Sequence, residues 1–494
     1  MTVPPEQAET AAFLRGLAGA DPVETHISLV FLGADTVWKL KKAVRLSFLD
    51  FSGVSDRRRF CERELTLNAP AAPGLYRDVV PVMRRPDGAL ALGGEGIVLD
   101  WVLRMARVPA ADFLDVMADQ GRFDPLLLDP IADAVAAYHR SLPALIGAIP
   151  DMTSVATGNA RAALDAGLPR TEVDAWKRAI GLALDSLTPW LAERAATGFV
   201  RRAHGDLHLG NLCLWRGKPV PFDALEFDEA LATIDLGYDL AFLLMDLDRR
   251  VGRAAANQVM SRYVARTGDA VLVRGLPAFL SLRALVRAHV SARSGKIESG
   301  GAYLTSAAAY LHPVPPLVVA VGGLPGTGKS TLARALAPEI GMAPGALVVR
   351  SDEIRKRLSG VAPEERLPQS AYTPDVSRTV FEALTETVRV AAKGGQAVIA
   401  DATFMDPDHR SMVKNAARQA GVPFHGFWLQ ASLPDLEQRV AARTGDASDA
   451  TVAVLHAAAP NDPGPLDWTP IDASDATKAL AQVRNFLPFV REPC

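Results

Sequence analysis

The chain has 494 residues, 49% hydrophobic and 22% charged, a composition typical of a folded globular protein with about two to four domains. Its net charge of −3 excludes the bulk basic excess that favours nucleic acid or anionic membranes. Its three cysteines are far apart, which argues against a disulfide framework or a cysteine zinc site. No signal-peptide pattern opens the sequence and its apolar runs are short, so we expect a cytoplasmic protein without a membrane segment.

Strand-like segments come first in the chain, and helix-like segments follow. Short apolar runs rich in β-branched residues predict strands at 27–31, 36–39, 79–82 and 96–99. From about residue 110, alanine- and leucine-rich segments with helical spacing dominate, for example 128–142 and 172–196. We therefore predict a small, largely antiparallel sheet lobe over about 20–102 and a helical lobe over 103–312.

Two lysines and two glutamates in the predicted small lobe have the pattern of a nucleotide site. In protein kinases a strand lysine contacts the nucleotide phosphates and pairs with a glutamate on the next helix. Lys39 and Lys41 lie two apart, on one face of a predicted strand. Glu62 and Glu64 lie on a predicted helix over 57–67. We predict Lys39 and Glu64 as the nucleotide-binding pair, with Lys41 and Glu62 as alternatives.

The stretch 203–214, AHGDLHLGNLCL, concentrates residues that can perform chemistry. His204 and His208 have the i, i+4 spacing of a zinc-binding helix, but glycines interrupt the stretch and no glutamate follows the first histidine. Asp206 and Asn211 instead have the spacing of a kinase catalytic loop. In that loop the aspartate accepts the proton of the acceptor hydroxyl and the asparagine binds Mg²⁺.

A further metal-binding aspartate is expected on the next strand of such a site. Asp223 stands 12 residues after Asn211, at the end of a hairpin predicted to turn at 216–217. We therefore predict Asp206 as the catalytic base, with Asn211 and Asp223 as Mg²⁺ ligands. His208 has no assigned role.

These motifs resemble the aminoglycoside phosphotransferase and choline kinase branch of the protein-kinase-like fold, over about residues 20–312. The resemblance implies transfer of a phosphoryl group from a nucleotide to a hydroxyl acceptor. In the stretch 234–241 it implies that Asp235 and Asp239 are scaffold residues. One departure is the phosphate-covering loop, which the sequence shows only as the short segment 32–35 without a GxGxxG pattern.

Three acidic residues after the predicted metal aspartate leave two interpretations open. They could form an acidic cleft for a polycationic acceptor such as an aminoglycoside, or a solvated acidic loop. The residues are Glu226, Asp228 and Glu229. Because a fold does not fix its substrate, the resemblance does not decide between them.

A Pro-rich segment, 313–316, precedes a second phosphate motif. Three prolines there cannot continue a helix, and the apolar run 317–321 that follows predicts a buried strand. The next segment, GLPGTGKS at 323–330, fits G-x-x-x-x-G-K-[ST]. In such a loop the backbone N–H groups cradle phosphates, the lysine reaches the β and γ phosphates, and the hydroxyl binds Mg²⁺. The predicted nucleotide-binding residues are Gly323, Gly326, Thr327, Gly328, Lys329, Ser330 and Thr331.

Carboxylates follow the next two predicted strands, at Asp352 and Asp401. This half resembles the P-loop kinases of the polynucleotide kinase, zeta toxin and chloramphenicol phosphotransferase type, over 317–475. The resemblance implies Asp352 as the base toward the acceptor hydroxyl, Asp401 and Ser330 as metal ligands, and Arg355 as a phosphate or substrate contact. A helix N-cap is the alternative role for Asp352.

Two further arginines belong to the same resemblance. Arg439 and Arg443 lie four apart, and so on one face of a predicted helix. The resemblance implies that they are catalytic lid arginines, acting with Lys329. A solvated helix face remains the alternative.

The order of the motifs resembles bacterial fusions of an aminoglycoside phosphotransferase-like domain with a P-loop ATP-binding domain. We predict a multidomain α+β and α/β chain: a bilobal protein-kinase-like fold at 1–312, a linker at 313–316, and a parallel P-loop sheet covered by helices at 317–494.

The predicted function is a bifunctional kinase that uses ATP or GTP and Mg²⁺ at two sites, with hydroxyl-bearing small molecules as acceptors. One alternative is a single catalytic half beside a regulatory nucleotide-binding half. Another is a polynucleotide 5′-hydroxyl kinase in the P-loop half. Against the latter, residues 317–494 hold 18 Lys and Arg against 20 Asp and Glu, without the basic excess that backbone binding favours.

Overall fold

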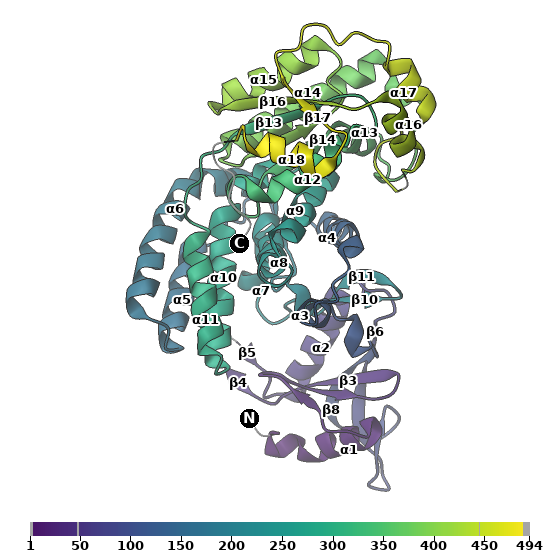
Figure 1. Cartoon of the computed structure of the whole chain (residues 1–494). Helices are drawn as coiled ribbons and strands as arrows, with labels where there is room; N and C mark the ends of the chain where they lie inside the picture. The colour runs from purple at the N-terminus through teal and green to yellow at the C-terminus, as the bar shows by residue number, and fades with distance from the viewer. Residues whose placement is uncertain (1–2, 47–48, 444, 488–494) are drawn as a thin grey trace. The chain divides into compact units, whose positions relative to one another are not determined.

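The computed structural model describes the chain except residues 1–2, 47–48, 444 and 488–494 (Figure 1). It divides into two compact units, one of residues 1–150 and 189–243, the other of residues 151–188 and 244–494. Two helices contribute residues to both units: α6 (Arg170–Ala196) and α8 (Leu236–Arg250). The Pro-rich residues 313–316 lie inside the second unit, and a domain boundary there stays a prediction.

The first unit is built on a six-stranded antiparallel sheet, ordered β1-β2-β3-β8-β6-β7. Its strands are β1 (Val23–Glu24), β2 (Ser28–Leu32), β3 (Thr36–Lys41), β6 (Tyr76–Arg84), β7 (Leu90–Leu92) and β8 (Ile97–Ala106). Leu29, Phe31 and Leu40 pack in one core with residues of helix α1 (Ala8–Ala18). Because side chains alternate along a strand, Lys39 and Lys41 point to the opposite face, which helix α2 (Val54–Asn68) covers.

The rest of the first unit carries the catalytic-loop motif. Its elements are β4 (Arg45–Leu46), β5 (Leu49–Asp50), α3 (Leu114–Asp119), α4 (Leu128–Ser141), β9 (Val200–Arg202), β10 (Leu212–Trp215), β11 (Lys218–Pro221), α7 (Glu229–Ala232) and β12 (Thr233–Asp235). The predicted hairpin is confirmed: β10 pairs with β11, and Arg216 and Gly217 turn between them with φ of 54° and 76°. Two positive φ values are typical of the two-residue turn that matches strand twist.

The second unit contains a five-stranded parallel sheet, ordered β14-β15-β13-β16-β17. Its strands are β13 (Val318–Gly322), β14 (Leu347–Arg350), β15 (Val398–Asp401), β16 (Phe424–Gln430) and β17 (Thr469–Asp472). Its helices are α5 (Met152–Asp165), α9 (Arg253–Thr267), α10 (Leu276–Arg293), α11 (Ile297–Ala309), α12 (Lys329–Leu336), α13 (Ser351–Leu358), α14 (Pro374–Lys393), α15 (Pro407–Ala420), α16 (Leu433–Ala441), α17 (Val452–Ala458) and α18 (Ala476–Arg484). None of the helices in the described part of the chain has the length and apolarity to cross a bilayer.

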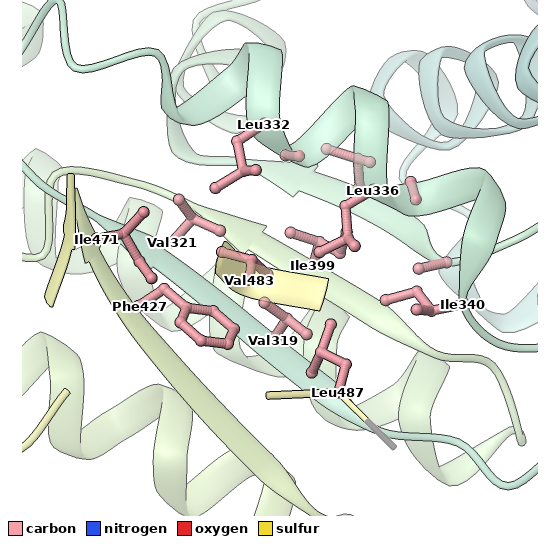
Figure 2. Packing of buried hydrophobic residues seen from close by; sticks show 14 of the residues in the cluster. Val319, Val321, Leu332, Leu336, Ile340, Ile399, Phe427, Ile471, Val483 and Leu487 are labelled. Atoms are coloured by element: carbon pink, nitrogen blue, oxygen red, sulfur yellow. The ribbon is translucent and has the colours of Figure 1, made fainter. Parts of the chain in front are cut away.

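The core of the parallel sheet explains its near-continuous apolar strands. Val319 and Val321 of β13 pack with Leu332 and Leu336 of α12 and with Val483 of α18 on one face of the sheet (Figure 2). All five residues of β13 are buried, as expected for a central parallel strand covered on both faces. The predicted combination of α+β and α/β folds is therefore confirmed.

The edge strand β14 is covered by helix α9 of the same unit. Asn257 Nδ2 donates to the carbonyl of Ala346 at 2.8 Å, and Val348 N–H donates to Ser261 Oγ at 3.2 Å. These side chains supply partners to backbone groups that an edge strand leaves unpaired. The helix thereby fixes the strand that leads into Asp352.

Candidate active sites

A cavity of about 480 Å³ in the first unit holds many of the residues predicted for the kinase-like half. Its walls are mostly apolar side chains of β2, β3 and β8 and of nearby segments, among them Val30, Leu32, Val37, Met105, Val108 and Phe222. Lys39, Asp206 and Asp223 line the same cavity. An apolar pocket that converges on a few charged groups is typical of a small-ligand site.

Lys39 joins the helix glutamate to the predicted metal aspartate. Its Nζ lies 2.8 Å from Glu64 Oε1 and 2.6 Å from Asp223 Oδ1. Burial opposes the charge of Lys39, but Asp223 and Glu64 raise its pKa well above its usual value. The structure thus brings the predicted pair together. The alternative Glu62 lies on the surface and pairs with Arg58 at 2.8 Å.

Lys41 also contacts Glu64, at 2.8 Å from its second carboxylate oxygen. Burial disfavours the charged form of Glu64, yet Lys39 and Lys41 lower its pKa to about 2. Of the two lysines, Lys39 lines the cavity, whereas the Lys41 side chain is 1% exposed. The geometry therefore favours Lys39 as the phosphate contact.

Asp206 and Asn211 are joined directly. Asn211 Nδ2 donates to the backbone carbonyl of Asp206 at 2.8 Å and to its carboxylate at 2.9 Å. His208 accepts the N–H of Gly210 at 3.0 Å, and its Nε2 lies 3.5 Å from Asp206 Oδ2. These contacts orient the Asp206 carboxylate, which is partly open to solvent. His208, to which the sequence analysis assigned no role, thus lies beside that carboxylate.

The carboxylate of Asp239 holds the start of the same loop through two hydrogen bonds. Its carboxylate accepts the backbone N–H groups of His204 and Gly205 at 2.9 and 3.0 Å. His204 is buried, and its Nε2 lies 2.9 Å from the carbonyl of Phe222. Because the segment is not helical, His204 and His208 do not share the face that a zinc helix requires.

A turn that the sequence did not predict borders this cavity. It is Thr25–Ile27, between β1 and β2. Lys42 Nζ holds it by donating to the Thr25 carbonyl at 2.5 Å. Of the segment 32–35, expected from the sequence as the phosphate-covering loop, Leu32 also lines the cavity, and Gly33–Asp35 close the turn between β2 and β3. Strand β1 is only two residues long, so the sequence shows no strand pattern before the turn Thr25–Ile27.

The second site lies at the ends of the parallel strands, in a cavity of about 940 Å³. The phosphate loop follows β13, and Gly323, Gly326 and Gly328 all have positive φ, between 86° and 137°. These conformations suit glycine because it has no Cβ. Lys329 Nζ lies across the loop and donates to the carbonyls of Gly323 and Leu324 at 3.0 and 2.9 Å.

Two glycines of this loop provide a stability prediction. A Cβ on Gly326 would lie 2.8 Å from the Leu436 carbonyl oxygen, whereas a Cβ on Gly328 would meet nothing within 4 Å. Gly328→Ala is expected to lose about 1–2 kcal/mol from the left-handed backbone alone. Gly326→Ala is expected to lose about 1–3 kcal/mol more, because a backbone atom must also move. Urea unfolding of both variants measures the difference; equal losses would contradict the loop geometry.

The predicted metal ligands of this site touch each other. Ser330 Oγ donates to Asp401 Oδ2 at 2.6 Å. Mg²⁺ in phosphoryl-transfer sites takes one or two protein oxygens and completes its shell with water and phosphate oxygens, so this pair fits it. Within the described residues, no group of three or more His, Cys, Asp or Glu side chains is arranged as a denser metal site.

Asp352 lines the cavity near Asp401 and Lys329. Burial raises the pKa of its carboxyl group, Asp401 raises it further, and Arg350 and a hydrogen bond from Ser448 lower it. Helix α13 begins at Ser351 with Arg350 as its N-cap residue, so the alternative of Asp352 as the N-cap is wrong.

The Ser448 hydrogen bond gives a pH prediction. If Asp352 acts as the base, phosphoryl transfer falls as pH drops through its raised pKa. Ser448→Ala removes a contact that lowers this pKa, so the acid limb of kcat/KM is expected to move to higher pH. The pH–rate profiles of wild type and Ser448→Ala measure the shift. A limb that stays in place or moves to lower pH would contradict the role of Asp352.

The predicted arginines are all in the lining of the cavity, but they are held differently. Arg355 donates to the Ala371 carbonyl at 2.6 Å and stacks on Tyr372 at 4.7 Å. Arg439 donates to the carbonyls of Ala473 and Ser474 at 2.8 and 2.7 Å, so it fastens the chain after β17. Arg443 lies 3.8 Å from Asp446.

Sequence reasoning missed a buried arginine that contacts Asp401 of this site. Arg350, the last residue of β14, contacts Asp401 at 3.2 Å, Asp446 at 2.7 Å and Glu353 at 3.5 Å. One of these contacts orients Asp401, the predicted metal ligand, and another holds the loop after α16 through Asp446. The sequence contains one sign of this role: Arg350 is a charged residue at the end of an apolar strand, two residues before Asp352.

The first half thus has the organisation of the protein-kinase-like fold and the second half is a P-loop domain, so the predicted fusion is confirmed. Residues 318–460 match the model of an AAA domain family. The whole chain is similar to uncharacterized proteins of Mycobacterium tuberculosis (strain H37Rv) and Mycobacterium bovis. Each is 28% identical over 466 residues, which cover 91% of this chain and 90% of the relative.

Further similarities concern one half at a time. The adenylyl-sulfate kinase of Myxococcus xanthus is 35% identical over 120 residues, which cover 24% of this chain and 59% of that protein. The M. tuberculosis APS kinase CysC in complex with AMPPNP and APS is 19% identical, with coverage of 35% and 98% and a TM-score of 0.27. A GDP and kanamycin complex of an aminoglycoside 2″-phosphotransferase is 16% identical, with coverage of 61% and 98% and a TM-score of 0.39.

Proposed function

We propose that this chain is a phosphotransferase with two active sites, each moving the γ-phosphoryl group of ATP or GTP to a hydroxyl of a small-molecule acceptor. One observation carries the proposal: each half gathers, around one cavity, a lysine for phosphates, a carboxylate for the acceptor and oxygen ligands for Mg²⁺. Because ATP and GTP are cytoplasmic substrates, we place the enzyme in the cytoplasm.

In the P-loop site, the residues divide the work between donor and acceptor. The loop amides and Lys329 bind the phosphates, while Ser330 and Asp401 hold Mg²⁺. When bound, Mg²⁺ neutralises charge on the phosphates. Asp352, made more basic by burial, accepts the proton of the acceptor hydroxyl. Arg355 lies one helical turn on from Asp352, on the same face of α13, and contacts the acceptor.

In the kinase-like site, Asp206 takes the proton and Asn211 fixes its carboxylate. Lys39 binds the nucleotide phosphates, and Asn211 and Asp223 supply oxygen atoms to Mg²⁺. The apolar walls of β2, β3 and β8 hold the base. Lys39 Nζ lies 2.6 Å from Asp223 Oδ1, so Lys39 and Mg²⁺ would share this carboxylate as a partner.

A regulatory role for the first half is the second candidate. The turn Thr25–Ile27 contains no glycine, unlike the loops with which kinases cover phosphates. Such a site could bind a nucleotide without transferring its phosphoryl group. The balanced charge of residues 317–494 gives no support to a polynucleotide acceptor.

Calorimetric titration of the full chain with ATP or GTP in Mg²⁺ tests the proposal. We expect two nucleotides per chain, one after Lys329→Ala and one after Lys39→Met. Turnover at both sites supports two catalytic sites. Two bound nucleotides with turnover only at the P-loop site support a regulatory first half. A single nucleotide in wild type would contradict the two-site proposal.

A further inference from the structure

Lys41 and Glu226 form a buried ion pair beside the kinase-like site, where Glu226 lines the cavity and Lys41 does not, and both side chains are 5% exposed or less. We infer that this pair is a positioning device: it holds Glu64 in place and so frees Lys39 to bind nucleotide phosphates. The inference rests on the proposed nucleotide binding of the first half. Lys41 and Glu226 would act through Glu64 and Lys39, without touching the reacting atoms.

Each carboxylate oxygen of Glu64 accepts a hydrogen bond from a different lysine. Lys39 Nζ lies 2.8 Å from Oε1 and Lys41 Nζ lies 2.8 Å from Oε2. Lys41 continues to Glu226, which stands three residues after Asp223. Three segments are therefore linked through side chains: strand β3, helix α2 and the segment that carries the metal aspartate.

The two lysines differ in what they face. Lys39 is 13% exposed and lines the cavity, and its second partner, Asp223, is 41% exposed. Lys41 is 1% exposed, and its partners Glu64 and Glu226 are 0% and 5% exposed. Lys39 can therefore exchange partners with a ligand, whereas Lys41 is enclosed by protein.

The buried charge of Glu64 explains why a second lysine is useful. When phosphates attract Lys39, the fully buried carboxylate would lose its counter-ion, which is strongly unfavourable. Lys41 remains as that counter-ion: burial lowers its pKa, but the carboxylates of Glu64 and Glu226 raise the pKa by more and keep the side chain charged. Without Lys41, Glu64 would compete with the nucleotide for Lys39.

Nucleotide binding in the full chain carrying Lys329→Ala, which removes binding at the P-loop, tests this inference. The probes are ATP and GTP with Mg²⁺, measured by calorimetry, with thermal melting as the check on folding. We expect Lys41→Met to weaken binding about tenfold and Glu226→Gln to weaken it about threefold. The matched control is Arg57→Met, which breaks the buried Arg57–Asp100 pair of the same lobe, away from the cavity, and is expected to leave affinity unchanged.

A double-mutant cycle separates positioning from general damage. If Lys41 acts by compensating Glu64, then Lys41→Met added to Glu64→Gln should cause no further loss of affinity. If Lys41→Met lowers nucleotide affinity equally with Glu64 and with Glu64→Gln, the inference is overturned. An equally large loss of affinity in Arg57→Met would also overturn it. If Lys41→Met does not fold, Glu226→Gln alone decides, and unchanged affinity there also overturns it. No nucleotide binding in the Lys329→Ala chain would instead remove the proposed first site, and the inference with it.

Discussion

Replacing Lys329 with methionine is expected to lower kcat/KM at the P-loop site by about a thousandfold, or about 4 kcal/mol of transition-state stabilisation. The ammonium group already lies across the loop, 3.0 and 2.9 Å from two loop carbonyls, so it is positioned for the phosphates before they bind. Burial lowers the pKa of Lys329, whereas the nearby carboxylates of Asp401 and Asp352 raise it. A labelled γ-phosphoryl transfer assay measures the loss.

The matched control for this variant is Lys414→Met. Lys414 lies on the surface of the same unit and pairs with Asp467 at 2.6 Å, with both side chains more than half exposed. Exposed pairs of this kind contribute little, about 1 kcal/mol or less. The control should therefore keep full activity. A loss of less than tenfold for Lys329→Met would show that this lysine does not act on the transferred group.

Asp206→Asn is expected to reduce transfer at the kinase-like site by about 10² to 10⁴-fold, the range of a lost general base. The change preserves shape, and Asn211 can still donate to the residue-206 carbonyl and side-chain oxygen. Folding should therefore be unaffected. Steady-state kinetics of the variant should show this loss in one activity while the P-loop activity stays as in wild type.

Asp228→Asn provides the comparison for Asp206→Asn. Asp228 caps helix α7 by accepting the N–H of Leu231 at 3.0 Å, and asparagine caps as well as aspartate. No effect on either activity is expected. Full transfer activity at the kinase-like site in Asp206→Asn would contradict the role of Asp206 as its base.

Much of the fold could be predicted because its signals are local. Apolar runs at 27–31 and 36–39 correspond to β2 and β3, and the helical segment 128–142 corresponds to α4. The phosphate loop could be predicted because its glycine spacing, the strand before it and the helix after it all occur within about 20 residues. Ser330 and Asp401 then follow from the strand order: β13 and β15 are neighbours, and parallel strands end at the same edge.

The remaining site residues could not be predicted because their partners are distant in sequence. Glu226 lies 185 residues from Lys41, so no local pattern indicates that the two side chains pair. The three acidic residues of the segment 226–229 have different contacts. Glu226 is buried and pairs with Lys41, and Asp228 caps α7. Glu229 contacts Arg63 and Arg202. Glu226 also lines the cavity of the first unit, whereas Asp228 and Glu229 are not in its lining, so the three residues do not act as one acidic cleft or one solvated loop.

A chain with two kinase sites must carry out two independent transfer reactions. Labelled γ-phosphoryl transfer from ATP and GTP to a small-molecule extract, resolved by mass, tests it in wild type, Asp206→Asn, Asp352→Asn and the double variant. We predict two sets of phosphorylated products, each lost in one single variant and both lost in the double variant. Products that survive in the double variant, or that vanish together in either single variant, would contradict it.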